Sequence, residues 1–338
     1  MERGEAEAKM LEFIKKLPDE IREALDFDVP AFDFSEIAHV VFAGMGGSAI
    51  SGDLAKLHLS EIPIPMESVR DYTLPPYVSE KTLVFVSSYS GNTEEALAAY
   101  GDARERGAKV VAVTSDGKLA ERAERDGVPL VRIPGGLPPR TALGWLFVPL
   151  VKVFEVSGVV QGKLVELERV ADYLTELRDE FSTPDSPPFE LASRLYLRLP
   201  LIYTSRRLAP VGFRWKAQIN ENAKAFAHVA ELPELDHNEI TGIKNPPERV
   251  EEMWAVFLVD ADDHPRIKLR VKHTQELIRD SVLGTEVLES KGETPIERAF
   301  YLVYFGDFVS FYLAKFYFED PIAIPRIDEL KKRLANEQ

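Results

Sequence analysis

Residues 88–93 read Ser-Tyr-Ser-Gly-Asn-Thr and so combine hydroxyl and amide side chains with a glycine. They follow an apolar run near the end of the first quarter of the chain. The run at 82–86 reads as a buried strand, and residues 94–106 read as a helix with acidic residues in its first turn. Ser88, Ser90 and Thr93 therefore lie on a strand-to-helix turn, where free backbone N–H groups at a helix N-terminus suit a phosphate. An ordinary capped loop is the alternative, but a cap needs only one such side chain. The pattern favours an anion site.

A second glycine-rich turn precedes the first along the chain. Residues 44–49 read Gly-Met-Gly-Gly-Ser-Ala, which matches the dinucleotide fingerprint, and Glu67 follows where that fingerprint places an acid for the ribose. Residues 62–66 contain two prolines and would make a poor central strand. Both turns should lie at the carboxyl ends of neighbouring parallel strands, where open α/β sheets bind ligands. A nicotinamide-dependent enzyme stays open as an alternative.

Arg140 lies in a third turn, within the Gly- and Pro-rich residues 134–142 that follow the last expected strand of this half. A solvated surface arginine is the simpler interpretation. At the same sheet edge as the other two turns, however, Arg140 could pair with a phosphate or with a developing oxyanion.

Glu221 and His237 are the candidates for proton transfer. Glu221 lies in Asn220–Lys224, which we expect inside a long helix, and it could merely form a surface pair with Lys224. His237 follows sixteen residues later, and a lone histidine is more often structural. A Glu and a His from one region are also what proton transfer near neutral pH requires.

The elements that must position these residues form two α/β halves. In the first, strands are expected at 39–43, 82–86, 109–113 and 128–133, with helices at 5–26, 49–59, 94–106, 118–125, 141–157 and 161–181. Residues 182–188 are the expected linker. In the second, strands are expected at 199–204, 253–259 and 285–288, with helices at 210–229, 264–279 and 295–318. Strands alternating with helices predict a parallel sheet flanked by helices in each half.

Composition narrows the function classes. The 338 residues carry a net charge of −15, which argues against nucleic acid as a partner. The chain has no cysteine, so thiolate chemistry, disulfides and Cys metal sites are excluded. Neither a signal peptide nor an apolar run of transmembrane length is evident. We expect a cytoplasmic protein that does not bind membranes.

Taken together, these motifs resemble the bifunctional phosphoglucose/phosphomannose isomerases, which are built from two sugar isomerase (SIS) domains. The resemblance rests on Gly46–Ser48, Ser88–Thr93, Pro139-Arg140, Asn220–Lys224 and His237–Glu239, in that order. It implies an N-terminal helical segment (1–34), a first SIS domain with the phosphate loops (35–181), a second with the catalytic Glu and His (182–318) and a C-terminal segment with a helix (319–338).

The resemblance also implies a role for each matching residue. The sugar phosphate would be held by Gly47, Ser48, Ser88, Ser90 and Thr93. Glu221 would move the proton between C2 and C1, and Arg140 would stabilise the cis-enediolate. His237, contributed by the other subunit of a homodimer, and Lys331 would assist ring opening; Lys332 is the alternative to Lys331. Ile324 stands seven residues before Lys331, where related isomerases can offer a polar side chain near C2.

The resulting hypothesis is an aldose–ketose isomerase of carbohydrate metabolism, in glycolysis and gluconeogenesis, that needs no metal or cofactor. It would interconvert glucose 6-phosphate and fructose 6-phosphate, with mannose 6-phosphate left open because of Ile324. A SIS protein that binds a phosphosugar without turning it over is the alternative, but it would have no need for both Glu221 and His237.

Overall fold

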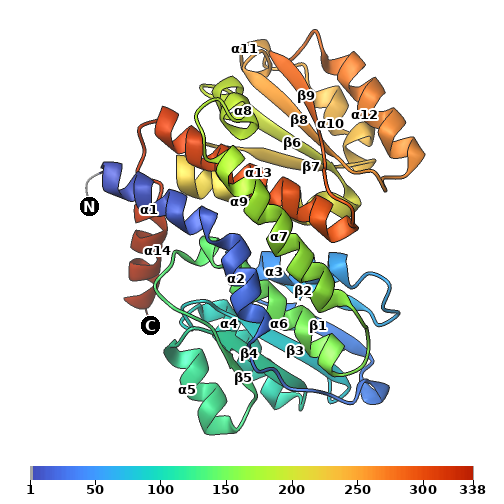
Figure 1. Cartoon of the computed structure of the whole chain (residues 1–338), viewed down its shortest axis with the longest axis vertical. Helices are drawn as coiled ribbons and strands as arrows, with labels where there is room; N and C mark the ends of the chain where they lie inside the picture. The colour runs from blue at the N-terminus through green and yellow to red at the C-terminus, as the bar shows by residue number, and fades with distance from the viewer. Residues whose placement is uncertain (1–2, 338) are drawn as a thin grey trace. The chain divides into compact units, whose positions relative to one another are not determined.

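Two parallel sheets organise the chain, one in each of two compact units (Figure 1). The structure is a computed structural model and describes residues 3–337. Within these residues, the first unit comprises 15–179 and 290–302, and the second comprises 3–14, 180–289 and 303–337. The change at 179/180 lies close to the expected linker.

The first sheet has five strands in the order β2-β1-β3-β4-β5, all parallel. Its strands are β1 (His39–Ala43), β2 (Met66–Val69), β3 (Thr82–Ser87), β4 (Lys109–Thr114) and β5 (Leu130–Arg132). The central strands are buried, as their continuous apolar sequences require, and every residue of β3 is buried. The strand order reverses between β1 and β3, and such a reversal is where open α/β sheets bind ligands.

Helices surround this sheet, and three of the four connections between its consecutive strands contain a helix. They are α2 (Leu17–Leu25), α3 (Gly46–His58), α4 (Glu94–Glu105), α5 (Gly117–Asp126), α6 (Leu143–Val156) and most of α7 (Lys163–Phe181), with short 3-10 turns η1 (Phe34–Glu36) and η2 (Pro139–Thr141). The helix expected at 5–26 is in fact two, because α1 (Arg3–Lys15) ends before α2, in whose first turn Pro18 stands.

The second sheet has four parallel strands in the order β7-β6-β8-β9, which reverses between β6 and β8. They are β6 (Leu199–Ser205), β7 (His228–Leu232), β8 (Met253–Val259) and β9 (Gly284–Glu289). The helical elements are α8 (Pro187–Leu195), η3 (Arg206–Leu208), α9 (Ala209–Ala223), η4 (Glu234–His237), α10 (Glu239–Gly242), α11 (Pro247–Val250), α12 (Pro265–Ile278), most of α13 (Pro295–Phe316) and α14 (Pro325–Ala335).

The helix expected at 210–229 was wrong for its last six residues, 224–229. It ends at Ala223, because Lys224 adopts a left-handed conformation with φ 53°. The chain then forms β7, which pairs with β6 in the register Leu201↔His228. The short apolar run after Lys224 suits an edge strand as well as a helix, so periodicity alone could not decide.

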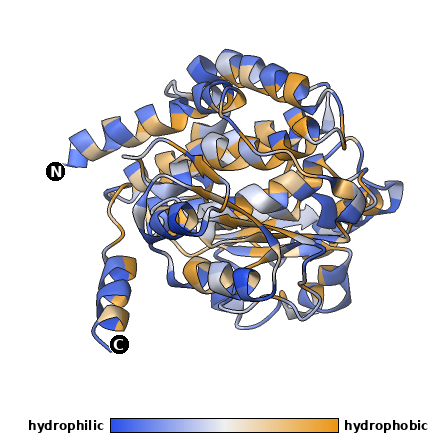
Figure 2. Cartoon of the chain, turned by 90° about the horizontal axis from the view of Figure 1, so that it is seen from below, coloured by the Kyte–Doolittle hydropathy of each residue, from blue (hydrophilic) through white to orange (hydrophobic). Residues whose placement is uncertain are grey.

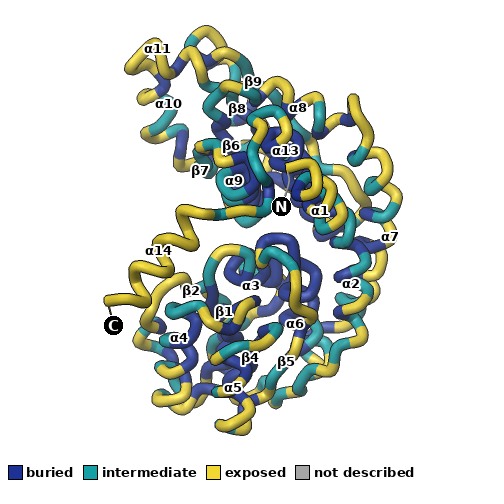
Figure 3. Tube along the Cα trace, turned by 90° about the vertical axis from the view of Figure 1, so that its left-hand side faces the viewer, coloured by how far each residue is buried: buried dark blue, intermediate teal, exposed yellow. Residues whose placement is uncertain are grey.

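The last helix, α14, is exposed along its whole length (Figure 3). Figure 2 shows hydrophilic and hydrophobic residues side by side on it, and Ile327, Leu330 and Leu334 supply exposed apolar side chains. Within residues 3–337, none of the helices combines the length and hydropathy needed to cross a bilayer.

Candidate active site

The N-terminus of α3 is the first element of the candidate site. It follows β1 directly, and residues Gly46–Ser48, expected as a loop, make its first turn. Gly44 is required by close packing, because a Cβ there would lie 2.7 Å from the Ser87 carbonyl oxygen. The first turn contains no acidic residue. No carboxylate in this turn competes for the N–H groups of Gly46 and Gly47, whereas the Ser48 N–H donates to the Met45 carbonyl oxygen at 3.1 Å.

The Ser88–Thr93 loop follows β3, the strand next to β1, with Ala43 paired to Val86. Ser88 is buried, and its Oγ donates to Thr93 Oγ1 at 3.0 Å. Ser90 is exposed, so its hydroxyl is accessible to a ligand. Thr93 caps α4 through its backbone only, and no side-chain capping bond occupies its hydroxyl.

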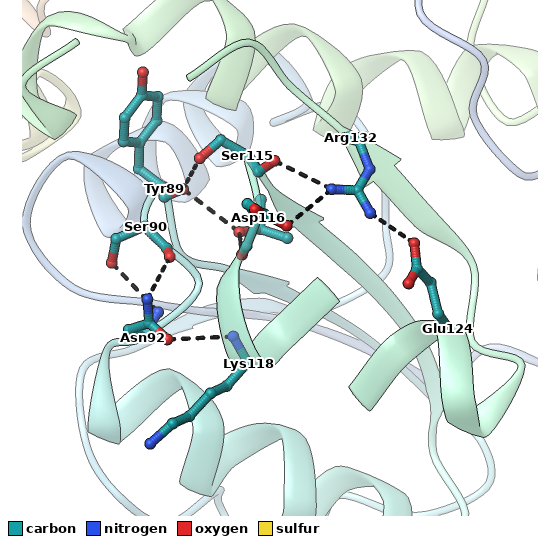
Figure 4. A network of polar contacts seen from close by, with 9 residues as sticks. Tyr89, Ser90, Asn92, Ser115, Asp116, Lys118, Glu124 and Arg132 are labelled. Carbon is teal, nitrogen blue, oxygen red and sulfur yellow. Dashed lines mark hydrogen bonds and ion pairs between the residues drawn. The ribbon is translucent and has the colours of Figure 1, made fainter. Parts of the chain in front are cut away.

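A third loop, residues 114–118 between the end of β4 and the start of α5, holds the Ser88–Thr93 loop in place (Figure 4). Ser115 Oγ donates to the Tyr89 carbonyl oxygen at 2.7 Å, and the Lys118 N–H donates to Asn92 Oδ1 at 3.2 Å. Gly91 has φ +68°, and a Cβ on it would lie 1.7 Å from the Asp116 carbonyl oxygen. Sequence reasoning did not single out this supporting loop, although its Ser-Asp-Gly sequence after a strand was the available signal.

Arg140 lies in η2 and is buried, at 4 % exposed, rather than solvated on the surface. The α3 N-terminus packs directly against it, because a Cβ on Gly47 would lie 3.0 Å from the Pro139 carbonyl oxygen and 3.4 Å from Arg140 Cα. The loop before η2 is also tied to the Ser88–Thr93 loop, since the Leu137 N–H donates to Tyr89 Oη at 2.9 Å. The three predicted motifs of the first unit thus meet at one sheet edge.

The dinucleotide alternative fits this geometry poorly. Glu67 pairs with Val41 in the middle of the edge strand β2, away from the strand's carboxyl end. Its carboxylate already accepts a hydrogen bond from Tyr77 Oη. The acid expected for a ribose is therefore engaged elsewhere.

In the second unit, Glu221 lies in the last turn of α9 and is partly buried. Asn220–Ala223 are helical as expected, but they form the end of α9 rather than its interior, and Lys224 lies beyond the helix. Lys224 does not simply project as a surface partner: its Nζ donates to the Asn222 carbonyl oxygen at 3.2 Å and to the Asp320 carbonyl oxygen.

His237 ends the 3-10 turn η4 and is exposed. Two residues later, Glu239 connects this segment to the sheet: it accepts from Tyr203 Oη at 2.7 Å and contacts His228 Nε2 at 2.9 Å. The hydrogen bond to Glu239 raises the pKa of His228. Burial alone would raise the pKa of Glu239, but hydrogen bonds from His228 and Tyr203 outweigh burial and lower that pKa. Sequence reasoning gave no role to His228 or Glu239.

Lys331 and its neighbour Lys332 are both exposed on α14. Ile324 occupies the N-cap position of this helix and is partly buried. Of the expected site residues, Gly47, Ser48, Ser88, Ser90, Thr93 and Arg140 belong to the first unit, and Glu221, His237 and Lys331 belong to the second. Among the residues that the structure describes, no group of three or more His, Cys, Asp or Glu side chains is placed to hold a metal.

Comparison with known proteins identifies both sheets. The SIS domain family matches residues 33–126, and the family of bacterial phospho-glucose isomerase C-terminal SIS domains matches residues 185–334. Among solved structures, tagatose-6-phosphate ketose/aldose isomerase from Escherichia coli superposes with a TM-score of 0.69 at 16 % identity, covering 93 % of this chain and 94 % of that one. At that identity the likeness shows the fold: two SIS domains, each a parallel sheet flanked by helices.

Two relatives with much higher sequence identity specify the family. The bifunctional phosphoglucose/phosphomannose isomerase of Caldicellulosiruptor bescii is 41 % identical over 338 residues, covering 96 % of this chain and 99 % of the relative. The enzyme of the same name from Aquifex aeolicus is 36 % identical over 326 residues, with the same coverage of both chains. With this identity along nearly its whole length, the chain belongs to the family of bifunctional phosphoglucose/phosphomannose isomerases.

Proposed function

We propose that this protein is an aldose–ketose isomerase that interconverts glucose 6-phosphate and fructose 6-phosphate and also accepts mannose 6-phosphate. Family membership supports the reaction. One observation carries the site: the α3 N-terminus, the Ser88–Thr93 loop and buried Arg140 meet at the carboxyl edge of the first sheet, where the strand order reverses.

In this proposal the phosphate is an anchor rather than a reacting group. The N–H group of Gly47 and the hydroxyl of Ser48, with the hydroxyls of Ser88, Ser90 and Thr93, would bind its oxygens. Binding energy from the phosphate, which is remote from C1 and C2, can then support orientation at the reacting carbons.

The chemistry is a proton transfer between neighbouring carbons. In the open-chain aldose, the Glu221 carboxylate would take the proton from C2 as the C1 carbonyl oxygen gains negative charge, giving a cis-enediolate. The Arg140 guanidinium would stabilise that charge, since it is cationic at any physiological pH. Returning the proton to C1, while O1 gains and O2 loses a proton, gives the ketose. His237 and Lys331 would assist the preceding ring opening.

Turnover of mannose 6-phosphate would pass through the same enediolate intermediate. Glucose and mannose differ only in the configuration at C2, and the enediolate has lost that difference. Ile324, at the start of α14, lacks the polar group that related isomerases can offer near C2, so acceptance of both epimers would not depend on such a group. Replacing it by Thr should change the ratio of glucose to mannose 6-phosphate turnover, while an unchanged ratio would remove Ile324 from the account of specificity.

A coupled assay with purified protein tests the reaction. EDTA is kept in every reaction, because the proposal requires no metal ion. Wild type should turn over the sugar 6-phosphates, and Glu221→Gln should lose at least about a hundredfold in kcat, the lower range for a missing general base. Glu276→Gln, at an exposed position on α12, is the matched control and should keep full activity. Binding without turnover by wild type would instead favour a phosphosugar-binding regulator.

We further propose a cytoplasmic homodimer in which His237 serves the site of the partner subunit. Exposure of His237 on η4 supports this arrangement. Mixing inactive Glu221→Gln and His237→Ala chains after joint refolding should restore activity, because a mixed dimer would contain one intact site. No recovery, with mixed dimers present by native mass spectrometry, would mean that each chain uses its own histidine.

A further inference from the structure

Buried polar side chains at every fourth position of α9 face two polar residues of α13. All of these residues belong to the second unit. Arg214 forms a bidentate ion pair with Asp307. Arg214 Nε donates to Asp307 Oδ1 at 3.0 Å, and Arg214 Nη2 donates to Asp307 Oδ2 at 2.7 Å. One turn later, Gln218 Nε2 donates to Asp307 Oδ1 at 2.9 Å. A further turn along, Asn222 Nδ2 donates to Ser310 Oγ at 2.9 Å. These five residues are called the polar ladder below.

The polar ladder lies in the interior of the unit. Asn222 and Ser310 are 0 % exposed, and Arg214 and Asp307 are 3 % exposed. Burial raises the pKa of Asp307 in spite of the neighbouring Arg214. Replacing such a network by apolar residues often leaves stability unchanged, so its advantage is a fixed geometry rather than a stronger core.

The helices around the polar ladder are packed closely. A Cβ on Gly306 of α13 would lie 2.2 Å from Trp215 Nε1 of α9, so the two helices meet where Gly leaves space for the indole. The rings of Trp215 and Phe305 stack with their centroids 6.0 Å apart. Apolar contacts of this kind hold the helices together without a preferred direction, whereas the hydrogen bonds of the polar ladder have a defined direction.

Glu221 immediately precedes Asn222, the last residue of the polar ladder on α9. Terminal turns of helices have unpaired carbonyl groups and fray readily, yet here the turn is held at two points. Asn222 is tied to α13 through its side chain, and Lys224 Nζ donates to the Asn222 carbonyl oxygen. Ser310 Oγ in turn donates to the Asp307 carbonyl oxygen at 2.7 Å, which orients it to accept from Asn222.

We propose that the polar ladder positions Glu221, and that Asn222 and Ser310 are positioning residues for proton transfer at C2. The proposal rests on the proposed function, in which Glu221 is the base. It also accounts for Asn222 in a helix, where asparagine is a poor helix former: its side chain is needed for the bond to α13.

Ser310→Ala tests the positioning role, because it removes the acceptor of Asn222 and leaves the Arg214–Asp307 pair intact. Ser193→Ala is the matched control. Ser193 also donates to a carbonyl three residues earlier, Glu190 at 2.7 Å, but it lies exposed on α8. With fructose 6-phosphate we expect Ser310→Ala to lower kcat about tenfold while KM stays within about twofold, as for a misplaced base rather than lost binding.

An isotope effect separates positioning from general structural damage. With glucose 6-phosphate deuterated at C2, Ser310→Ala should show a primary effect on kcat larger than that of wild type, since the slowed step is the transfer from C2. Asn222→Ala should behave like Ser310→Ala. The double variant should lose no more kcat than either single variant, because both changes remove the same Asn222–Ser310 hydrogen bond.

Distinct results would overturn the proposal. Unchanged kcat in Ser310→Ala, a smaller isotope effect, or additive losses in the double variant would each show that the bond does not position Glu221. Wild type without isomerase activity would instead refute the proposed function, so the two failures can be told apart.

Discussion

Replacing Gly91 by Ala should disrupt the proposed phosphate loop more than its conformation alone would suggest. Gly91 has φ +68°, which costs an L-residue about 1–2 kcal/mol. The new Cβ would also lie 1.7 Å from the Asp116 carbonyl oxygen and 2.9 Å from Thr114 Oγ1. Because these atoms belong to the supporting loop 114–118, relief requires that the two loops move apart, and overpacking of this kind costs about 1–3 kcal/mol.

Gly127→Ala is the matched control. Gly127 has a similar φ of +65° at the end of α5 in the same unit, but a Cβ there would meet nothing within 4 Å. We therefore expect Gly127→Ala to lower the free energy of unfolding by about 1–2 kcal/mol. Gly91→Ala should lower it by about 2–5 kcal/mol, the sum of both costs.

Urea unfolding of the two variants measures this difference, and calorimetry with fructose 6-phosphate measures its consequence. Gly91→Ala should bind the sugar phosphate at least about tenfold more weakly, which is about 1.4 kcal/mol, and Gly127→Ala should bind like wild type. Equal stability losses would refute the packing of the two loops. A Gly91→Ala protein that binds normally would refute the role of the loop in holding the phosphate.

Three further predictions address other parts of the site. Arg140→Ala should lower kcat by about a hundredfold or more, the range for a lost oxyanion donor, whereas Arg125→Ala, at an exposed position on α5, should not; steady-state kinetics of both variants checks this. The raised pKa of His228 means that its pairing with Glu239 stabilises the fold fully below the usual pKa of 6.5 and is lost as pH rises through the raised value. The thermal midpoint difference between wild type and His228→Gln should therefore be larger at about pH 6 than at about pH 9, and a difference independent of pH would contradict it. Finally, Arg207 at the corresponding edge of the second sheet is already paired with Asp260, so calorimetry with a sugar-acid 6-phosphate that cannot isomerise should give one site per chain rather than two.

Local sequence patterns were enough for most of the first unit. Apolar runs located β1, β3 and β4, and strand-to-helix alternation correctly placed the glycine and serine turns at one edge. Arg140 could be placed near them because it follows the last strand of the same sheet. That it is buried could not be predicted, since burial depends on α3 packing against η2, nearly a hundred residues away in sequence.

The parts that the sequence did not predict depend on contacts between distant residues. The end of α9 is set by the left-handed Lys224 and by pairing of β7 with β6, neither of which periodicity encodes. Glu239 meets Tyr203 across 36 positions. Asn222 looked anomalous in a helix because its partner, Ser310, lies 88 positions further along the chain.

The central claim is that Glu221 moves the proton between C2 and C1 of a substrate anchored by its phosphate. Fructose 6-phosphate incubated with the enzyme in deuterium oxide, followed by proton NMR, tests it most directly. Wild type should place deuterium at C2 of the aldose product, since a proton held on the carboxylate can exchange with solvent. Glu221→Gln should still bind the sugar phosphate and should incorporate deuterium at least about a hundredfold more slowly. Incorporation by Glu221→Gln at the wild-type rate would contradict the account.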